Sequence, residues 1–455
     1  MKTRILLAVF AAVAMVGCSN EEPTLIIQSD EASSAEMVFV KNRTVEEAVE
    51  IANQLAEMLD NEQSRGKSRI ATGMNSVQII GSPSSRSGEL ADTLLYVVSY
   101  DNGNGYAIIS APEHLNPLIG LVEKGEFATL STAENSEFQF YMDAAKNYVK
   151  RNSHEFNPDA GNGFELTPAF TDVKRVIQDR VEPKLTVEWG QGFPEGYFCP
   201  NKISGCVQTA TVQVMSYFEQ PKSLELTYPG RDKDLEKIYW PQTKGHVQSS
   251  NLTNQSEYDA HFAQCPGSTY VHYALGRLCR EIGYRNNANY KPASTGVSIS
   301  PLYSEAMVAQ RYNLAEWLPN QKVSGFRILS DYVKLYDELK SGGIVMFNGI
   351  DDNAGGGHAW VADGAFQQKT ITTRTYSYND PFTGRPHVVV MESFQNIFHF
   401  NWGWNGNSNG YFDAGVFAPD NKSQHPAVAD KIPGDLPSFS RGYDFSDYVE
   451  YCVIK

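Results

Sequence analysis

A cysteine at the start of an expected helix is the first candidate for chemistry in this sequence. Cys206 falls in the first helical turn, with Ser204 as the expected cap residue and Pro221 ending the helix. In that position the unpaired N–H groups and the positive end of the helix dipole stabilise a thiolate relative to a thiol. Taken alone, such a cysteine is more often a small buried apolar residue. Cys206 therefore needs a partner before it can be assigned as a nucleophile.

His358 is the candidate partner. It follows Gly355-Gly356-Gly357 and precedes the strand-like run Ala359 to Ala362. A catalytic imidazole needs a rigid strand behind it and an open approach in front, and this segment offers both. The alternative is a structural histidine at the start of a strand. A phosphate-binding loop is excluded, because no Lys-Ser or Lys-Thr follows the glycines and no helix begins there.

Three further residues have the types that a Cys–His pair requires. Gln191 precedes Cys206 and is expected to donate to a developing oxyanion together with the backbone N–H of Cys206. Asn401 and Trp402 follow an expected strand, and they are expected to orient the ring of His358 and to shield it from water. Each of these residues is a weak signal by itself.

The N-terminal half is expected to form a small α+β domain. A helix is predicted from Thr44 to Leu59, because Thr44 can cap it while Glu47 reaches back, and apolar residues recur at helical spacing. Asn and Gly between the first two predicted strands supply the positive φ angles of a hairpin turn. This half has no cluster of Cys, His and acidic residues, so catalysis is not expected in it. The predicted strands cover residues 94–100, 106–110 and 117–121.

The stretch from Arg151 to Glu182 is expected to be a linker between two domains. It is rich in Asn, Gly, Asp, Pro and basic residues and has no sustained periodicity. Lys174, Arg175 and Arg180 are expected to be exposed residues at which a protease cuts the chain. The alternative for each of them is an ordinary solvated loop.

The first residues are expected to be a targeting signal. Lys2 and Arg4 precede an apolar run from Ile5 to Val16, which is typical of a signal peptide. The run ends at Cys18 in a segment that resembles the lipobox of bacterial lipoproteins, whose cysteine is acylated; an ordinary secretory signal is the alternative. Acyl chains would hold the protein at a membrane without a spanning helix. The expected location is the bacterial outer membrane or the cell surface, with release of a matured form.

Composition excludes several classes of function. The chain has 455 residues, with 38 Lys and Arg against 53 Asp and Glu, and a net charge of −15. Without a basic stripe it is not expected to bind nucleic acid. No later segment approaches the roughly 18 apolar residues of a membrane span, and the few scattered cysteines do not suggest a disulfide scaffold. Zinc-binding motifs are absent from the sequence, so no metal and no other cofactor is expected.

Taken in chain order, the segments that carry Gln191, Cys206, His358 and Asn401 resemble the streptopain family of papain-like cysteine peptidases. The resemblance covers most of the chain, and the combination is far more specific than any single segment. Two positions depart from the family pattern: Ala365 stands where an aromatic residue is usual, and Trp360 is bulkier than usual. Both are expected to alter packing or a pocket wall. The segments are Trp189-Gly190-Gln191, Gly205-Cys206-Val207-Gln208-Thr209-Ala210, Gly356-Gly357-His358-Ala359 and Asn401-Trp402-Gly403-Trp404-Asn405-Gly406.

The resemblance implies an α+β fold in which a papain-like peptidase domain, with a helical lobe and an antiparallel β lobe, follows a small α+β pro-domain. It implies an exported zymogen of a cysteine endopeptidase, acting on proteins or peptides and inhibited by its own pro-domain. The membrane is then a partner only through the lipid anchor. The expected segments are a lipoprotein signal peptide (1–17), a tether (18–35), an inhibitory pro-domain (36–150), an activation linker (151–182) and a peptidase domain (183–455).

Two other classes of function remain open at this point. One is a surface binding protein that keeps the papain-like shape without turnover, although the retained Cys206, His358 and Gln191 oppose it. The other is a papain-like amidase or transglutaminase that acts on side-chain amides or cell-wall peptides. Nothing in the sequence indicates glycan binding.

Overall fold

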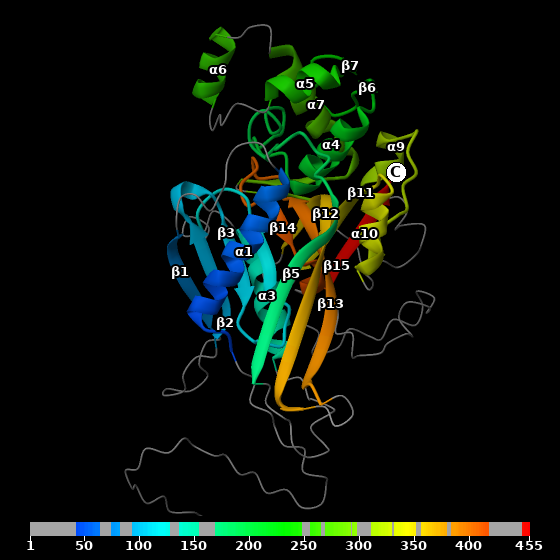
Figure 1. Ribbon diagram of the computed structural model, residues 1–455. Coiled ribbons are helices and arrows are strands. Elements are labelled where there is room, and N and C mark those ends of the chain that lie inside the picture. Colours follow the sequence, from blue (N-terminus) through cyan, green and yellow to red (C-terminus); the bar gives the residue numbers. More distant parts are fainter. Residues whose placement is uncertain are drawn as a thin grey trace, which may run out of the picture. The chain divides into compact units, whose positions relative to one another are not determined.

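The computed structural model separates a group of helices from one large antiparallel sheet (Figure 1). This is the α+β class expected from the sequence, with a helical part and a β part in the peptidase domain. The proposed signal peptide, the tether and Cys18 lie outside the described residues. The structure describes residues 42–63, 74–81, 93–127, 136–153, 169–247, 255–264, 269–292, 294–297, 311–329, 332–351, 356–379, 384–417 and 448–455.

The N-terminal elements form four antiparallel strands with a helix on each face. Side chains alternate along β2: Val98 packs in the core that contains α1, whereas Val97 packs in the core that contains α3. The sheet is therefore covered on both sides. The elements are α1 (Val45–Gln63), β1 (Met74–Gly81), β2 (Thr93–Tyr100), a 3-10 turn η2 (Asp101–Gly103), β3 (Tyr106–Ser110), β4 (Leu118–Val122) and α3 (Ser136–Asn152).

Local signals in this domain act as the sequence indicates. The N–H of Thr44 donates to Oε2 of Glu47 at 2.7 Å, and the N–H of Glu47 donates to Oγ1 of Thr44 at 3.2 Å. This reciprocal capping box starts α1 where it was predicted, and the helix then continues to Gln63. The predicted hairpin is confirmed as β2 and β3, with Asn102 at φ 60° and Gly103 at φ 68° in its turn.

The helical part of the expected peptidase domain is built around α4 (Cys206–Phe218). Every residue of α4 from Cys206 to Ser216 is buried, and the helix packs in a cluster with α7 and with the start of β12. The other elements here are β6 (Ser223–Glu225), β7 (Leu235–Lys237), α5 (Trp240–Val247), α6 (Gln255–Gln264), α7 (Thr269–Arg285), β8 (Asn289–Lys291), β9 (Ser294–Gly296), η6 (Arg311–Asn313) and α9 (Leu314–Trp317).

The sheet of the expected peptidase domain continues directly into the sheet of the N-terminal domain. β4 pairs with β14, with Leu121 opposite Tyr411, so the order is β1-β2-β3-β4-β14-β13-β12-β11-β15-β10. Both domains also contribute to one shared hydrophobic cluster. The peptidase elements are β10 (Arg327–Ile328), α10 (Val333–Lys340), β11 (Ile344–Asp351), β12 (Gly356–Asn379), β13 (Pro386–Asn401), β14 (Gly410–Phe412), η7 (Ala414–Phe417) and β15 (Tyr448–Ile454).

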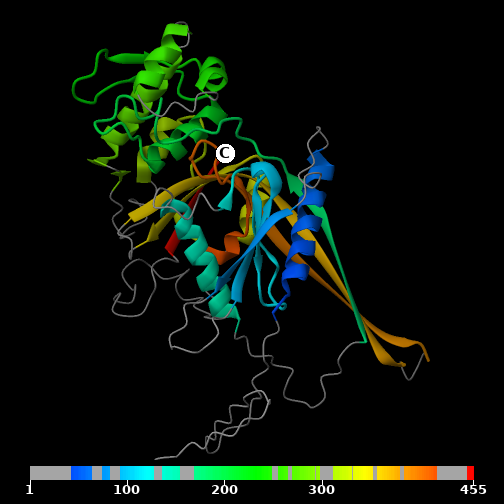
Figure 2. The same ribbon diagram turned by 90° about the vertical axis from the view of Figure 1, so that its left-hand side faces the viewer.

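The structure differs from the sequence-based expectation in the linker. Residues Phe170–Val181 form β5, which pairs with β12, and Figure 2 shows the two strands side by side with β13 in a long ribbon. The expected exposure holds for Lys174, whereas Arg175 is half-buried. The side chain of Arg180 is only 7% exposed, because it bonds to the hydroxyl of Tyr411 at 2.8 Å. The linker is therefore partly a strand.

Two further observations concern the described residues only. None of the helices in these ranges is long and apolar enough to cross a membrane. The cysteines described, Cys199, Cys206, Cys279 and Cys452, are buried free thiols.

Candidate active site

Cys206 is the first residue of α4, and Gly205 rather than Ser204 is its cap residue. Gly205 has φ 96°, and a Cβ there would lie 2.9 Å from the carbonyl oxygen of Thr295. The cap predicted at Ser204 is wrong by one residue, because a left-handed φ and a close backbone approach both favour glycine. Ser204 instead donates from its N–H and its hydroxyl to the carbonyl oxygen of Gln191, at 2.8 and 3.1 Å.

The thiol of Cys206 lies against the strand that carries His358. Its Sγ is 3.9 Å from the carbonyl oxygen of Gly357, and Cys206 and Ala359 belong to the same buried cluster. His358 is on β12, opposite Gly349 of β11, and is 2% exposed. Helix packing thus brings the candidate nucleophile to the residue next to the candidate base.

A carbonyl oxygen holds the ring of His358 and determines where its proton lies. Nε2 is 3.0 Å from the carbonyl oxygen of Trp402. A carbonyl oxygen only accepts, so Nε2 carries the proton and donates it. In the neutral imidazole Nδ1 is then the basic nitrogen, and it is the atom that can take a proton from a thiol.

Three tryptophan rings surround this imidazole. The ring centroids of Trp360, Trp402 and Trp404 lie 6.0, 6.1 and 5.0 Å from that of His358. Trp402 is fully buried, and charge interactions strengthen where water is excluded; the shielding of His358 by this ring stays a prediction. Trp404 was not predicted as a site residue. Trp404 lies two residues after Trp402, and this spacing is the signal that could have found it. The two rings are stacked, with their centroids 5.4 Å apart.

The side chain of Asn401 lies in a network of hydrogen bonds. Its Nδ2 donates to the carbonyl oxygen of Val187 at 2.8 Å, and its Oδ1 accepts from Nε2 of Gln213 at 3.0 Å and from the N–H of Gly403 at 3.2 Å. These bonds fix the backbone on either side of Trp402, whose carbonyl oxygen is the group that contacts the ring. The side chain of Asn401 thus bonds to the segments next to Trp402, and its expected role of orienting His358 stays a prediction.

Side chains of α4 hold the segment that carries Gln191 by hydrogen bonds to its backbone carbonyl groups. Oγ1 of Thr209 donates to the carbonyl oxygen of Gly190 at 3.0 Å, and Nε2 of Gln213 donates to that of Trp189 at 3.2 Å. Gln191 itself is half-buried. Thr209 and Gln213 were not predicted as site residues; they are two of several buried polar residues of α4, so their residue type alone does not single them out.

The N-terminal domain packs against the tryptophans of this site. The ring of Phe138 on α3 lies 6.3 Å from the rings of both Trp402 and Trp404, edge to face. Tyr141 lies 5.8 Å from Trp402 and 4.9 Å from Phe412. α3 therefore covers the back of the rings that enclose His358.

A buried charge cluster also joins the two domains. Nδ1 of His399 is 2.6 Å from Oδ1 of Asp363, and its Nε2 is 3.7 Å from Oε2 of Glu123, which follows β4. Burial alone lowers the pKa of His399, but the carboxylates of Asp363 and Glu123 overcome this and raise the pKa to about 10. The histidine is thus a cation shared by both domains at neutral pH.

Replacing Glu123 by glutamine is expected to reduce the stability of the chain most at neutral pH and below, and this loss should shrink as the pH rises towards about 10. A histidine with a raised pKa stabilises the fold fully below its ordinary pKa of 6.5, and this contribution is lost as the pH rises towards about 10. Without Glu123 the pKa of His399 falls, so the contribution is smaller and is lost at a lower pH. The measurement is the thermal unfolding midpoint across this range.

Glu57→Gln is the matched control for this experiment, because Glu57 is an exposed carboxylate on α1. It should leave the pH dependence of the wild-type chain unchanged. Coincident pH curves for Glu123→Gln and the wild type would contradict the assignment of Glu123 as a partner of His399.

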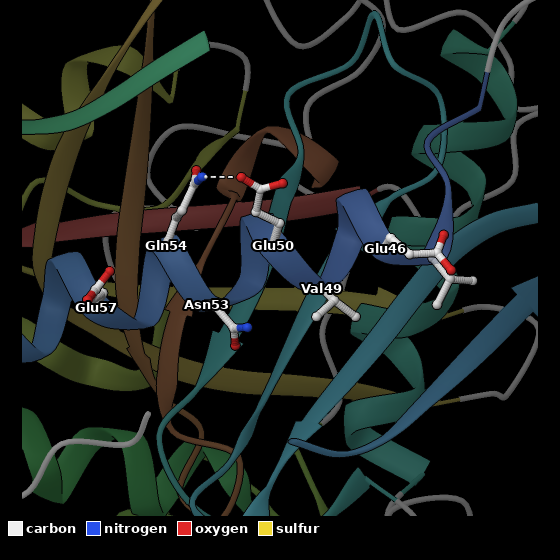
Figure 3. A pocket seen from close by; sticks show the side chains of 7 residues that line it. Glu46, Val49, Glu50, Asn53, Gln54 and Glu57 are labelled. Atoms are coloured by element: carbon white, nitrogen blue, oxygen red, sulfur yellow. Dashed lines mark hydrogen bonds between the residues drawn. The ribbon is translucent and has the colours of Figure 1, made fainter. Parts of the chain in front are cut away.

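A hollow on the exposed side of α1 has a different character (Figure 3). It is acidic and contains no thiol or imidazole, and Nε2 of Gln54 donates across it to Oε1 of Glu50 at 3.2 Å. It is therefore no candidate for the chemistry of Cys206. Its lining consists of Val45, Glu46, Val49, Glu50, Asn53, Gln54 and Glu57.

Known proteins resemble both domains. Residues 189–412 match the Peptidase C10 family, and residues 26–149 match the Spi protease inhibitor family. Streptopain of Streptococcus pyogenes is 23% identical over 73% of this chain and 76% of its own length. The thiol protease/hemagglutinin PrtT of Porphyromonas gingivalis is 20% identical, over 73% of this chain and 35% of that protein.

Solved structures were also matched. A prointerpain A fragment of Prevotella intermedia covers 84% of this chain and 98% of its own, with 18% identity and a TM-score of 0.46. Active interpain A covers 61% and 95%, with 19% identity and a TM-score of 0.34. On the matches of the two family models, the chain belongs to the Peptidase C10 family of streptopain-like cysteine peptidases and carries a Spi protease inhibitor domain ahead of its peptidase domain.

Proposed function

We propose that this chain is the zymogen of an exported cysteine endopeptidase, in which Cys206 is the nucleophile and His358 is the general base and acid. The observation that supports this most strongly is the contact of the Cys206 thiol with Gly357, together with the bond from His358 Nε2 to Trp402. The first places the thiol beside the histidine strand, and the second makes Nδ1 the basic nitrogen.

The reaction is hydrolysis through an acyl-enzyme. The Cys206 thiolate attacks the peptide carbonyl, and the His358 imidazolium gives its proton to the leaving amine. The neutral imidazole then takes a proton from water, which attacks the thioester and regenerates Cys206. Gln191 and the backbone N–H of Cys206 stabilise the oxyanion, with a contribution of about 3 kcal/mol for one donor. Trp402 supplies the carbonyl oxygen that holds the ring, and Asn401 positions that carbonyl.

The N-terminal domain is proposed to keep the enzyme latent until the 151–182 segment is cut. The pairing of β4 with β14 and the packing of α3 on Trp402 support this role. Because β5 is paired within the segment, the favoured sites of cutting are those outside Phe170–Val181. Export, acylation of Cys18 and attachment to the membrane through lipid alone are supported by the sequence of residues 1–18.

The proposal is tested by labelling with an epoxysuccinyl inhibitor of cysteine peptidases and by cleavage of casein, before and after an added protease removes the N-terminal domain. We expect the processed chain to cleave casein and to carry the label on Cys206. Cys206→Ala should lose both properties, whereas Cys452→Ala, which alters another buried thiol, should keep both.

The outcomes distinguish the alternatives. Labelling without casein cleavage would indicate an amidase or a transglutaminase, and the absence of both would indicate a binding protein. Equal activity of the uncut and the processed wild-type chains would contradict the proposed latency of the uncut chain but not its activity as a peptidase.

A further inference from the structure

Gln213 has an unusual position for a polar residue that the reaction does not use. It lies in the third turn of α4 and is completely buried. Its Nε2 donates to the carbonyl oxygen of Trp189 at 3.2 Å and to Oδ1 of Asn401 at 3.0 Å. A side-chain amide nitrogen has two N–H donors, so one group can serve both acceptors.

The first of these bonds leads to the oxyanion donor. Trp189 precedes Gln191 by two residues, and the carbonyl oxygen of Gly190 between them accepts from Thr209, also on α4. Gln213 and Thr209 therefore hold this segment to the helix that begins with Cys206. Together with the bonds from Ser204 to the carbonyl oxygen of Gln191, they fix the position of Gln191 relative to the thiol.

The second bond leads to the imidazole. Oδ1 of Asn401 accepts from Gln213 and from the N–H of Gly403 at 3.2 Å, while Nδ2 donates to Val187 at 2.8 Å. With its amide fixed at three points, Asn401 holds the backbone of Trp402. The carbonyl oxygen of Trp402 is the acceptor for Nε2 of His358.

We propose that Gln213 is a positioning residue that couples the oxyanion segment and the Trp402 carbonyl to the nucleophile helix. It touches neither substrate nor the reacting atoms, and it acts on His358 through Asn401. The inference rests on the proposed function. Replacing the buried amide of Gln213 should cost free energy, because the carbonyl oxygen of Trp189 and Oδ1 of Asn401 would both lose this donor in a buried site.

The physical consequence concerns the rate of the chemical step more than substrate binding. The bond from Nε2 to the carbonyl of Trp402 becomes charge-assisted when the imidazolium forms, and such bonds are stronger than neutral ones. A carbonyl that is free to shift stabilises the imidazolium less well. Displacements of about 1 Å in such a constellation reduce rates by about 100-fold.

The test compares Gln213→Leu, which has a similar volume but no donors, with the wild type after processing. We expect kcat to fall about 10- to 100-fold while KM changes by less than about 3-fold. Thr211→Val is the matched control, because Thr211 is a buried polar residue of the same helix whose hydroxyl bonds only within α4, to Val207 at 2.7 Å. It should leave kcat and KM unchanged.

A double-mutant cycle tests the route through Asn401. In an Asn401→Ala background, Gln213→Leu should lower kcat by a smaller factor than it does in the wild type, because the path through Asn401 is already lost and only the bond to Trp189 remains to be removed. Independent effects that multiply in full would overturn the coupling. If Gln213→Leu fails to fold, Gln213→Asn retains the amide with a shorter reach and should give a smaller fall in kcat with KM preserved.

The two hypotheses fail in different ways. A wild-type chain without hydrolysis or labelling at Cys206 defeats the proposed function. An active wild type together with a Gln213→Leu or Gln213→Asn variant of unchanged kcat defeats only the positioning role of Gln213.

Discussion

Replacing His358 by alanine should lower kcat/KM of the processed enzyme by about 100- to 10,000-fold. The bond from Nε2 to the carbonyl oxygen of Trp402 makes Nδ1 the basic nitrogen, and the thiol of Cys206 lies beside the preceding residue. Without the imidazole, the thiol has no positioned base and the leaving amine has no positioned acid. The measurement is the steady-state hydrolysis of a peptide substrate at neutral pH.

The control is His387→Ala, because His387 is on the same sheet but on the part of β13 where exposed and half-buried side chains alternate. This variant should hydrolyse the substrate as the wild type does. The rate of alkylation of Cys206 provides a second readout that does not need turnover, and it should fall in His358→Ala near neutral pH. Retention of more than about a tenth of the wild-type kcat/KM would contradict the role of His358.

Short-range signals predicted the elements whose cause is local. The capping box at Thr44 and Glu47 starts α1, and the Asn and Gly residues after β2 form the turn of the hairpin. In both cases the interacting atoms are within a few residues of one another, so their pattern is legible in the sequence. The predicted cap before Cys206 is wrong by one residue, because Gly205 is required partly by the close approach of the distant Thr295 backbone.

Long-range pairing explains what the sequence did not predict. β5 lies within a segment that was interpreted as a linker because its composition is polar and it lacks periodicity, yet it pairs with β12 about half the chain away. Both faces of this ribbon are partly exposed, so burial does not require apolar and polar residues to alternate along the strand. A strand of this kind is specified by its partner and not by its own pattern.

The contacts of Asn401 could not be predicted for a different reason. Its residue type and its place after a strand made it a candidate, whereas the ring of His358 hydrogen-bonds to the backbone carbonyl of Trp402. A carbonyl is present in every residue and leaves no trace in a sequence. The bond from Gln213 to Asn401 likewise forms only when α4 and the end of β13 are packed together, so neither residue reveals it in the sequence.

Tyr141 is the residue of the N-terminal domain whose removal should release latency most strongly. It is fully buried, and its ring packs edge to face on Phe412 at 4.9 Å, on Phe417 at 5.4 Å and on Trp402 at 5.8 Å. Truncation of a buried aromatic ring to alanine costs about 3 to 5 kcal/mol. Since each 1.4 kcal/mol is a factor of ten in an equilibrium, the fraction of chains with the inhibitory domain detached should rise by at least about 100-fold.

The expected result is that uncut Tyr141→Ala hydrolyses a peptide substrate at a rate at least about 100-fold above the uncut wild type, with gel analysis of the same samples verifying that the chain is intact. Tyr141→Phe separates the ring from its hydroxyl, which donates to the carbonyl oxygen of Ile119 at 2.7 Å. That carbonyl also accepts from the N–H of Asp413 at 2.8 Å, so it keeps a partner in Tyr141→Phe and latency should be nearly preserved. If uncut Tyr141→Ala stays as inactive as the wild type, and gains neither hydrolysis nor epoxide labelling of Cys206, then the packing of α3 on the tryptophans is not what keeps the enzyme latent.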